Sequence, residues 1–264
     1  EYDWDAQMRM TDRFLELGGA YFDTCYTYLE GNSELGVKRC LSERWPRERF
    51  QVADKLPGYQ CKCYEDAQKY FDESLARCGV DFFDVYMLHW LNGKNYAIAE
   101  QYDQFRFLRE KKAEGKAKRI GFSYHDGPEL LDEILTAHPC VDYVQLQINY
   151  IDWEHPSIES RKCLEVARKH NKPVIIMEPL RGGRLVNRLP EDAKTLFANH
   201  ENGWTPAQWS FRWLWDQKEV TCVLSGMNTM EMVQDNCSYM KDFKPLNDAE
   251  KHAVAQVLDI LRGF

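Results

Sequence analysis

The sequence predicts an α/β protein that folds as a (β/α)8 TIM barrel, in a single domain over residues 1–264. Seven short apolar runs recur about every 30 residues, which is the period of a strand followed by a helix. Patterns typical of amphipathic helices lie between the runs. A length of 264 residues is usual for one such barrel, and no linker or low-complexity segment divides the chain.

The seven runs are near-continuous in β-branched and aromatic residues. Strands that are buried on both faces of a parallel sheet have this composition. We expect right-handed crossovers between them, because consecutive parallel strands are joined in that way. The runs are AYFDT (20–24), FQVADK (50–55), FDVYMLH (83–89), KRIGFS (118–123), YVQLQIN (143–149), PVIIMEPL (173–180) and VTCVLSG (220–226).

The chain opens in a helix and not in a strand. Met10, Phe14 and Leu17 share one helical face, and Gly18-Gly19 is expected to end that helix. A helix before the first run implies a strand further upstream, which would supply the eighth strand. We therefore expect the native protein to begin before Glu1. The alternative is an open sheet of seven strands.

Later helices carry signals at their ends. Thr205 is a favourable N-cap, and Pro206 is favoured in the first turn, so a helix is expected over 206–216. Gly79 lies where a helix should stop. A further amphipathic helix is expected over 248–261.

Charge and cysteine content narrow the classes of partner and compartment. The net charge of −8 argues against nucleic acid or an anionic membrane as the main partner. No apolar run approaches the roughly 20 residues that span a bilayer. The nine cysteines are scattered, and only Cys61 and Cys63 lie close together, without partners that would complete a zinc site. Reduced thiols and a cytoplasmic location are expected, with no metal site.

Polar side chains stand at the carboxyl ends of the predicted strands, although the strands themselves are apolar. In a barrel of this kind, those ends build the active site. Four ionisable groups are the strongest candidates, because Tyr28 follows Asp23 in the next loop and two more strands end in Lys55 and His89. The full row of strand ends is Asp23, Lys55, His89, Ser123, Gln145 or Asn149, Glu178 and Ser225.

The four groups have complementary chemistry. A nearby ammonium from Lys55 would lower the pKa of the Tyr28 phenol, and Asp23 would keep that ammonium charged. Tyr28 could then pass a proton to a carbonyl oxygen, which neutral His89 could orient. Taken singly, each residue has a simpler role: a turn cap, rim packing, a solvated lysine or a core histidine. Their joint placement favours an active site.

The motifs around these residues resemble those of the aldo-keto reductase superfamily. FDTCYTYLEGNSELG is similar to F-D-T-A-x-x-Y-x-x-G-x-S-E-x-x-L-G, and VADK to the strand that ends in the catalytic Lys. DFFDVYMLHW and GKAKRIGFS are similar to D-Y-I-D-L-Y-L-x-H and G-K-I-R-x-I-G-V-S. The resemblance runs from about residue 6 to about residue 240. It implies a barrel that exchanges hydride between a nicotinamide cofactor and a carbonyl or alcohol, with Tyr28 as acid/base, Lys55 and Asp23 as its tuning pair and His89 as the orienting group.

The resemblance also implies cofactor contacts. Ser123 and Gln145 match residues that hold the carboxamide, and Met177 replaces the tyrosine that often stacks on the nicotinamide. The loop 179–185 has glycines and two arginines, which suit a pyrophosphate, although an ordinary surface turn is the alternative. Segment 225–236 resembles the adenosine end, with a helix N-terminus at Asn228 or Thr229. The candidates in these two segments are Leu180, Arg181, Gly183, Arg184, Ser225, Gly226, Met227, Asn228, Gln234 and Asn236.

The sequence leaves the choice between NADP and NAD open. The Lys and Arg that often bind the 2′-phosphate in the family are absent, and Gly226 and Met232 stand in their places. A helix N-terminus alone can hold a phosphate, but without a bidentate charge contact.

One subfamily is more similar still. GFSYHD, VIIMEPLRGGRL and VLSGMNTMEMVQDN resemble bacterial aldo-keto reductases that continue into a ferredoxin-like segment with 4Fe–4S clusters. No such cysteines are present up to Phe264, so any cluster would be bound outside this chain. A redox partner would then be expected.

The substrate is expected to be a small carbonyl or alcohol. Trp90, Tyr59, Tyr124 and His125 are the candidates for its pocket. Two other functions stay open: a regulatory or electron-transfer protein that binds cofactor but turns over little, and a barrel enzyme with non-redox chemistry.

Overall fold

Seven parallel strands form one sheet in the computed structural model, which describes residues 2–239 and 243–263. Each strand is hydrogen-bonded to its neighbours in chain order, from β1 to β7. All seven predicted runs are therefore confirmed as strands. Their bounds are β1 Tyr21–Asp23, β2 Gln51–Leu56, β3 Phe83–Leu91, β4 Ala117–Tyr124, β5 Tyr143–Gln147, β6 Val174–Met177 and β7 Val220–Val223.

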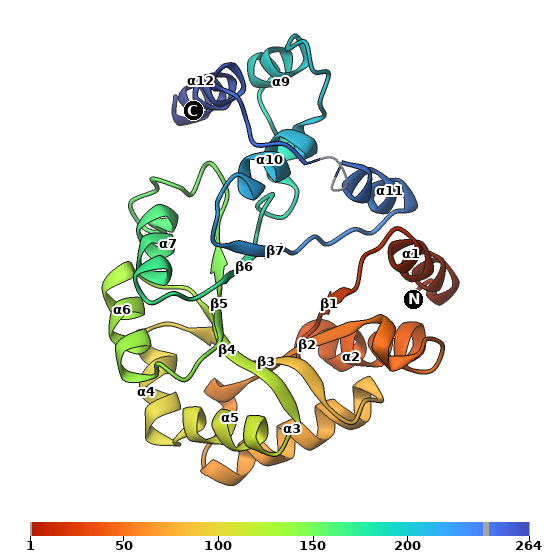
Figure 1. Cartoon of the computed structure of the whole chain (residues 1–264), viewed down its shortest axis with the longest axis vertical. Coiled ribbons are helices and arrows are strands. Elements are labelled where there is room, and N and C mark those ends of the chain that lie inside the picture. Colours follow the sequence, from red (N-terminus) through yellow and green to blue (C-terminus); the bar gives the residue numbers. More distant parts are fainter. Residues whose placement is uncertain (1, 240–242, 264) are drawn as a thin grey trace.

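The sheet curls, and helices surround its outer face (Figure 1). Strands β1 and β7 lie at the two edges, and in the described residues neither pairs with the other. This is the arrangement of a (β/α)8 barrel in which one strand between β7 and β1 is left out, as the sequence predicted. The fold class is confirmed in this form.

The helices follow the strands as a β-α repeat requires. Strand β2 is followed by α3, β3 by α4 and α5, β4 by α6, and β5 by α7. The bounds are α1 Trp4–Glu16, α2 Asn32–Val37, α3 Tyr64–Cys78, α4 Gly93–Gln101, α5 Gln104–Ala113, α6 Pro128–Ala137, α7 Ser160–Lys169, α8 Arg184–Asn187, α9 Glu191–Ala198, α10 Pro206–Trp215, α11 Met230–Ser238 and α12 Asp248–Arg262.

Local sequence explains several helix ends. Thr205 and Gln208 form a capping box at α10, with Pro206 in the first turn. Helix α3 ends at Gly79, whose φ of +65° is a conformation that glycine adopts without strain. These predicted signals are confirmed, to within one residue at the end of α10.

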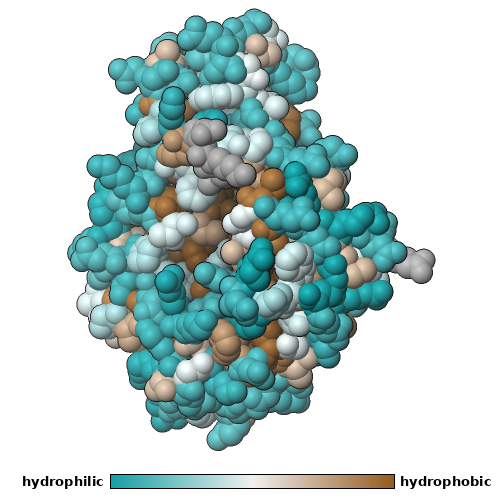
Figure 2. Space-filling view, turned by 45° about the vertical axis from the view of Figure 1, so that its right-hand side comes forward, coloured by the Kyte–Doolittle hydropathy of each residue, from teal (hydrophilic) through white to brown (hydrophobic). Residues whose placement is uncertain are grey.

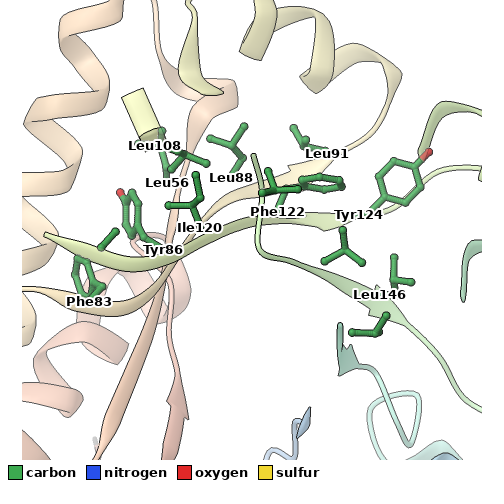
Figure 3. Close-up of a cluster of buried hydrophobic side chains, with 14 of the residues drawn as sticks. Leu56, Phe83, Tyr86, Leu88, Leu91, Leu108, Ile120, Phe122, Tyr124 and Leu146 are labelled. Carbon is green, nitrogen blue, oxygen red and sulfur yellow. The ribbon is translucent and has the colours of Figure 1, made fainter. Parts of the chain in front are cut away.

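Two apolar layers hold the sheet in place. Side chains of β2 to β5 meet the surrounding helices in the main core, where Tyr86, Phe122 and Leu108 are buried (Figure 3). Inward-facing residues of the same strands, among them Ala53 and Met87, fill the interior of the barrel. At roughly 25 cal/mol for each Å² of apolar surface buried, these layers supply the main stabilisation that fixes the strand ends.

Strands β5, β6 and β7 are shorter than predicted. The sequence pattern extended β6 to residue 180, but it ends at Met177 because Glu178 has a φ of +54°, outside the extended region. Strand β5 ends before Asn149, whose side chain accepts the backbone N–H of Asp152 in a loop. These residues bend the chain away at the carboxyl edge of the sheet.

The surface is mostly hydrophilic, and apolar side chains gather in a recess on one face (Figure 2). Among the helices that the structure describes, none combines the length and the apolar character that crossing a membrane requires.

Candidate active site

Lys55 lies at the centre of the site, near the carboxyl end of β2. Its Nζ forms an ion pair with the carboxylate of Asp23 at the end of β1, and it donates a 2.7 Å hydrogen bond to the carbonyl oxygen of Thr24. The Lys55 side chain is only 1% exposed. Separating the two members of a buried ion pair would leave each charge uncompensated, which is costly. The Lys55 and Asp23 side chains are therefore held in place by each other.

Tyr28 approaches this ion pair from the loop after β1. A turn closed by the Tyr28 N–H to the Cys25 carbonyl (3.0 Å) directs the chain back over the strand end. Leu29 and Glu30, with φ of +53° and +57°, then adopt left-handed conformations before α2. As a result the Lys55 ammonium lies 4.5 Å from the centre of the Tyr28 ring.

His89 reaches the same place through an irregularity in β3. Pairing between β3 and β4 shifts register between Leu88 and Leu91, and Trp90 has a φ of +60°. The Trp90 N–H is satisfied by Ser123 Oγ (2.7 Å), and its carbonyl by Asn95 Nδ2 (2.7 Å). Bulges of this kind often lie beside active sites, where they redirect a side chain.

The His89 ring lies in a cluster with three aromatic rings. The ring of Tyr28 is 5.7 Å from the His89 ring, centre to centre. Tyr59 lies 6.1 Å from His89 and 5.8 Å from Trp90. Tyr59 and Trp90, predicted from the sequence as walls of the substrate pocket, are therefore placed on the His89 side of the site.

The electrostatics keep the candidate proton donor protonated. Desolvation raises the pKa of Tyr28 above its usual value, although the Lys55 charge acts to lower it. The sequence suggested that Lys55 would lower this pKa, and its effect has that sign but is smaller than the effect of burial. Burial is the largest single effect on the pKa of Lys55 and would lower it, but the charge and hydrogen bond of Asp23, together with smaller effects of Tyr28 and Cys25, raise it overall. Burial lowers the pKa of His89 to about 3, so its ring is neutral.

Ser123 and Gln145 are paired in register on β4 and β5, as a shared contact with one amide group would require. Gln145 is 1% exposed, and its Oε1 is buried with no hydrogen-bond partner among the described residues. Ser123 Oγ accepts the Trp90 N–H and still has its own hydrogen to donate. An unmet acceptor next to a free donor fits the carboxamide of a nicotinamide.

The predicted pyrophosphate loop is held partly by its own contacts. Arg181 has a left-handed backbone (φ +47°), and its Nε lies 3.5 Å from Oδ1 of the fully buried Asp152. Its charge is thus partly compensated within the protein. Gly183 also has a left-handed backbone (φ +83°) and leads into α8, which begins at Arg184. No local sequence pattern predicts the Asp152 contact.

The predicted adenosine segment lies along a cavity of about 370 Å³. The cavity is bounded by Ser225, Met227 and Asn236 on one side, and by the end of α1 on the other. Asn236 Nδ2 donates to Ser225 Oγ (3.0 Å). The Thr229 hydroxyl accepts the Met232 N–H and caps α11. Of the two predicted positions for the helix N-terminus, Asn228 and Thr229, the structure shows Thr229.

Two predicted pocket residues lie elsewhere. Tyr124 is 2% exposed, packs in the main core, and donates its hydroxyl to the Gly127 carbonyl oxygen. His125 is exposed beside it, and the two border a separate cavity of about 210 Å³ with Gln147. Both residues follow Ser123 directly in the sequence, and this position alone does not show which way their side chains face.

Comparison with known proteins identifies the family. The model of the Aldo/keto reductase family matches residues 1–259. This chain belongs to that family. It is therefore an NAD(P)-dependent oxidoreductase with a small carbonyl or alcohol substrate, as its motifs suggested.

Curated relatives and solved structures agree with this assignment. The chain is 29% identical over 225 residues to an aldo-keto reductase of Mycobacterium avium, covering 84% of this chain and 71% of that protein. It is 24% identical over 283 aligned residues to the NADH-specific methylglyoxal reductase of Escherichia coli (90% and 83% covered).

The fold is similar to that of solved aldo-keto reductases. For the holo form of the enzyme from Bacillus halodurans, the TM-score is 0.81 at 21% identity (97% and 88% covered). For the Klebsiella pneumoniae enzyme in complex with NADPH, it is 0.77 at 22% identity (96% and 86% covered). The expected iron–sulfur segment and redox partner stay predictions, because neither the structure nor these relatives bear on them.

Proposed function

We propose that this protein reduces small aldehydes or ketones, or oxidises the corresponding alcohols, with Tyr28 as the proton donor and acceptor. The observation that carries the proposal is the buried Lys55–Asp23 ion pair, which places an ammonium 4.5 Å from the Tyr28 ring. When bound, the nicotinamide supplies or accepts the hydride.

The role of Tyr28 follows from its environment. Its raised pKa keeps the phenol protonated at neutral pH, so a proton is available for a carbonyl oxygen. Once that proton has left, the nearby Lys55 ammonium stabilises the phenolate. Asp23 and the Thr24 carbonyl hold the ammonium in place during both steps.

His89 positions the carbonyl in this proposal. Because its pKa is lowered to about 3, the ring is neutral and cannot supply a proton in place of Tyr28. A neutral ring can donate one hydrogen bond to the carbonyl oxygen and so orient it towards Tyr28. The rings of Tyr59 and Trp90 favour an uncharged substrate with apolar surface.

Ser123 and Gln145 would hold the carboxamide, and Met177, at the end of the neighbouring strand, would contact the ring. We propose NAD(H) as the preferred cofactor. Segment 225–236 carries no Lys or Arg, whereas Glu231 is in the first turn of α11. A 2′-phosphate there would meet negative charge without a cation to bind it.

We also propose a reducing, cytoplasmic location. Cys25, Cys78 and Cys163 are buried singly in different parts of the fold, which favours structural thiols.

The test of the activity is Tyr28→Phe, with Tyr102→Phe at the end of α4 as the control. Turnover of a panel of small aldehydes should fall at least about 100-fold in Tyr28→Phe, because the proton donor is lost. Nucleotide binding, followed by nicotinamide fluorescence, should be unchanged in both variants. Undiminished turnover in Tyr28→Phe would refute the assigned role, and failure of the parent to bind either nucleotide would refute the oxidoreductase proposal.

The cofactor preference has its own test. A Cβ added at Gly226 would meet no atom within 4 Å, so a lysine fits there without strain. We expect the parent to bind NADH more tightly than NADPH, and Gly226→Lys with Met232→Arg to raise NADPH affinity about tenfold or more. Gly226→Gln with Met232→Gln is the uncharged control. Tighter binding of NADPH by the parent would contradict the preference.

A further inference from the structure

A buried cysteine contacts the candidate orienting histidine. Cys25 is fully buried, and its Sγ lies 3.1 Å from Nδ1 of His89. The two residues are 64 positions apart in the sequence. The family stretch that this loop resembles has alanine at this position, F-D-T-A-x-x-Y, so the thiol is a departure of this chain from that motif.

The pair is not a nucleophilic dyad. Burial raises the pKa of the Cys25 thiol to about 11 and lowers the pKa of His89 to about 3. A thiolate facing an imidazolium would require these two values in the opposite order. Near neutral pH the contact therefore joins a neutral thiol, with one hydrogen, to a neutral imidazole, with one N–H and one bare nitrogen.

We propose that Cys25 is a positioning residue, which donates its S–H to Nδ1 of His89 and so keeps the ring proton on Nε2. The proposal rests on the proposed reductase function, in which His89 must donate a hydrogen bond to the substrate carbonyl. With Nδ1 occupied as an acceptor, Nε2 carries the only N–H. Among the described residues, no hydrogen bond engages Nε2.

The surroundings of the thiol support this direction of donation. Thr27 Oγ1 lies 3.4 Å from Sγ and can donate its own hydrogen to the sulfur. The other acceptor within reach, the carbonyl oxygen of Lys55, is at 3.9 Å. In a chain of hydrogen bonds, the Thr27 hydroxyl donates to the Cys25 sulfur and the Cys25 thiol donates to Nδ1 of His89, so each donor hydrogen is used once. In the opposite tautomer Nε2 would be a bare acceptor facing the acceptor oxygen of the carbonyl, which is repulsive.

The test is direct observation of the His89 tautomer by long-range ¹H–¹⁵N NMR, in the parent and in Cys25→Ala and Cys25→Ser. The signal is assigned by its loss in His89→Gln. We expect the Nε2–H tautomer in the parent and in Cys25→Ser, whose hydroxyl can also donate. In Cys25→Ala, which restores the residue of the family motif, we expect a mixture of tautomers.

Kinetics give a second readout. Cys25→Ala should lower kcat about tenfold, without a change in nucleotide affinity, and Cys25→Ser should recover part of the loss. Cys40→Ala, another buried cysteine, is the control that should change neither quantity. An Nδ1–H tautomer in the parent, or an unchanged tautomer in Cys25→Ala, would overturn the inference. The NMR readout needs no turnover, so failure of the reductase proposal is recognised separately.

Discussion

The two halves of the barrel hold their functional residues in different ways. Around β1 to β4, the polar groups beside the exposed Tyr28 ring are buried or half-buried and bonded to one another, as Lys55 is to Asp23 and Cys25 is to His89. Around β6, β7 and α11, the candidate cofactor residues are half-buried or exposed and make fewer contacts with one another. Proton transfer requires donor and acceptor groups that are fixed and shielded from water, whereas a nucleotide can bind at a surface. Substitutions in the first half should therefore affect both stability and chemistry, and those in the second half mainly affinity.

The largest effect is expected from Lys55→Met. The change leaves Asp23 without its counter-ion in a buried site, so the free energy of unfolding should fall by about 3–5 kcal/mol at pH 7. Turnover should be lost as well, since no ammonium remains beside Tyr28. Urea denaturation and aldehyde reduction measure the two effects. Adding Asp23→Asn to this variant should restore much of the stability but none of the activity.

Lys194→Met is the matched control for that pair. Lys194 pairs with Glu191 on the surface of α9, with side-chain exposures of 39% and 84%. Such a pair contributes at most about 0.5 kcal/mol. If Lys55→Met and Lys194→Met lower the free energy of unfolding by the same amount, the buried ion pair contributes no more to stability than the surface pair, contrary to the prediction.

An intermediate effect is expected from pH. The pKa of His89 is lowered to about 3 in the folded protein from a usual value of 6.5, so below pH 6.5 the unfolded chain binds a proton that the native state does not. Stability should therefore fall as pH decreases from 6.5 towards 3, by up to about 1.4 kcal/mol per pH unit. His89→Gln should reduce this slope, measured by urea denaturation at pH 7, 6 and 5.

The pH experiment has a second contributor and a control. The pKa of His125 is also lowered, but because this residue is exposed to solvent its contribution to the slope should be small. His252→Gln, on the exposed side of α12, should leave the slope as it is. An unchanged slope in His89→Gln would mean that His89 is solvated and not held neutral.

The smallest effect is expected from Asn236→Ala in the second half. The variant loses hydrogen bonds to Ser225 (3.0 Å) and from Tyr239 (3.2 Å), each worth about 1 kcal/mol or less at a half-buried position. We expect the Kd of the nucleotide to rise about fivefold, with kcat at saturating nucleotide unchanged. Asn199→Ala at the end of α9 is the control. A larger loss of kcat than of affinity would place Asn236 with the catalytic half.

The sequence predicted the parts of the molecule that depend on local pattern. Seven apolar runs became seven strands, and the polar residues at their ends brought Asp23, Lys55 and His89 together, because parallel strands end at one edge of the sheet. Tyr28 could be placed because a short loop joins it to Asp23.

Other features depend on contacts between distant residues. The His89–Cys25 and Arg181–Asp152 contacts join different loops, and nothing local signals either of them. Neither Gly nor Pro marks the bulge at Trp90, where a tryptophan adopts a left-handed backbone against its own preference. Tyr124 was misjudged for a related reason: position at a strand end does not say whether a side chain faces the mouth or the core.

The strained backbone at Trp90 has a consequence for how this enzyme can acquire new substrates. A non-glycine residue at a φ of +60° costs on the order of 1 kcal/mol or more, so exchange to Gly or Asn would relax the chain as it widens the rim. Most substitutions that shrink a side chain in a pocket wall lower the free energy of unfolding. At this position, such a substitution should broaden the substrate range and also relieve backbone strain. Trp90 is therefore a favourable first position for laboratory evolution. It is adjacent to His89 in the sequence, and the same bulge in β3 holds both residues.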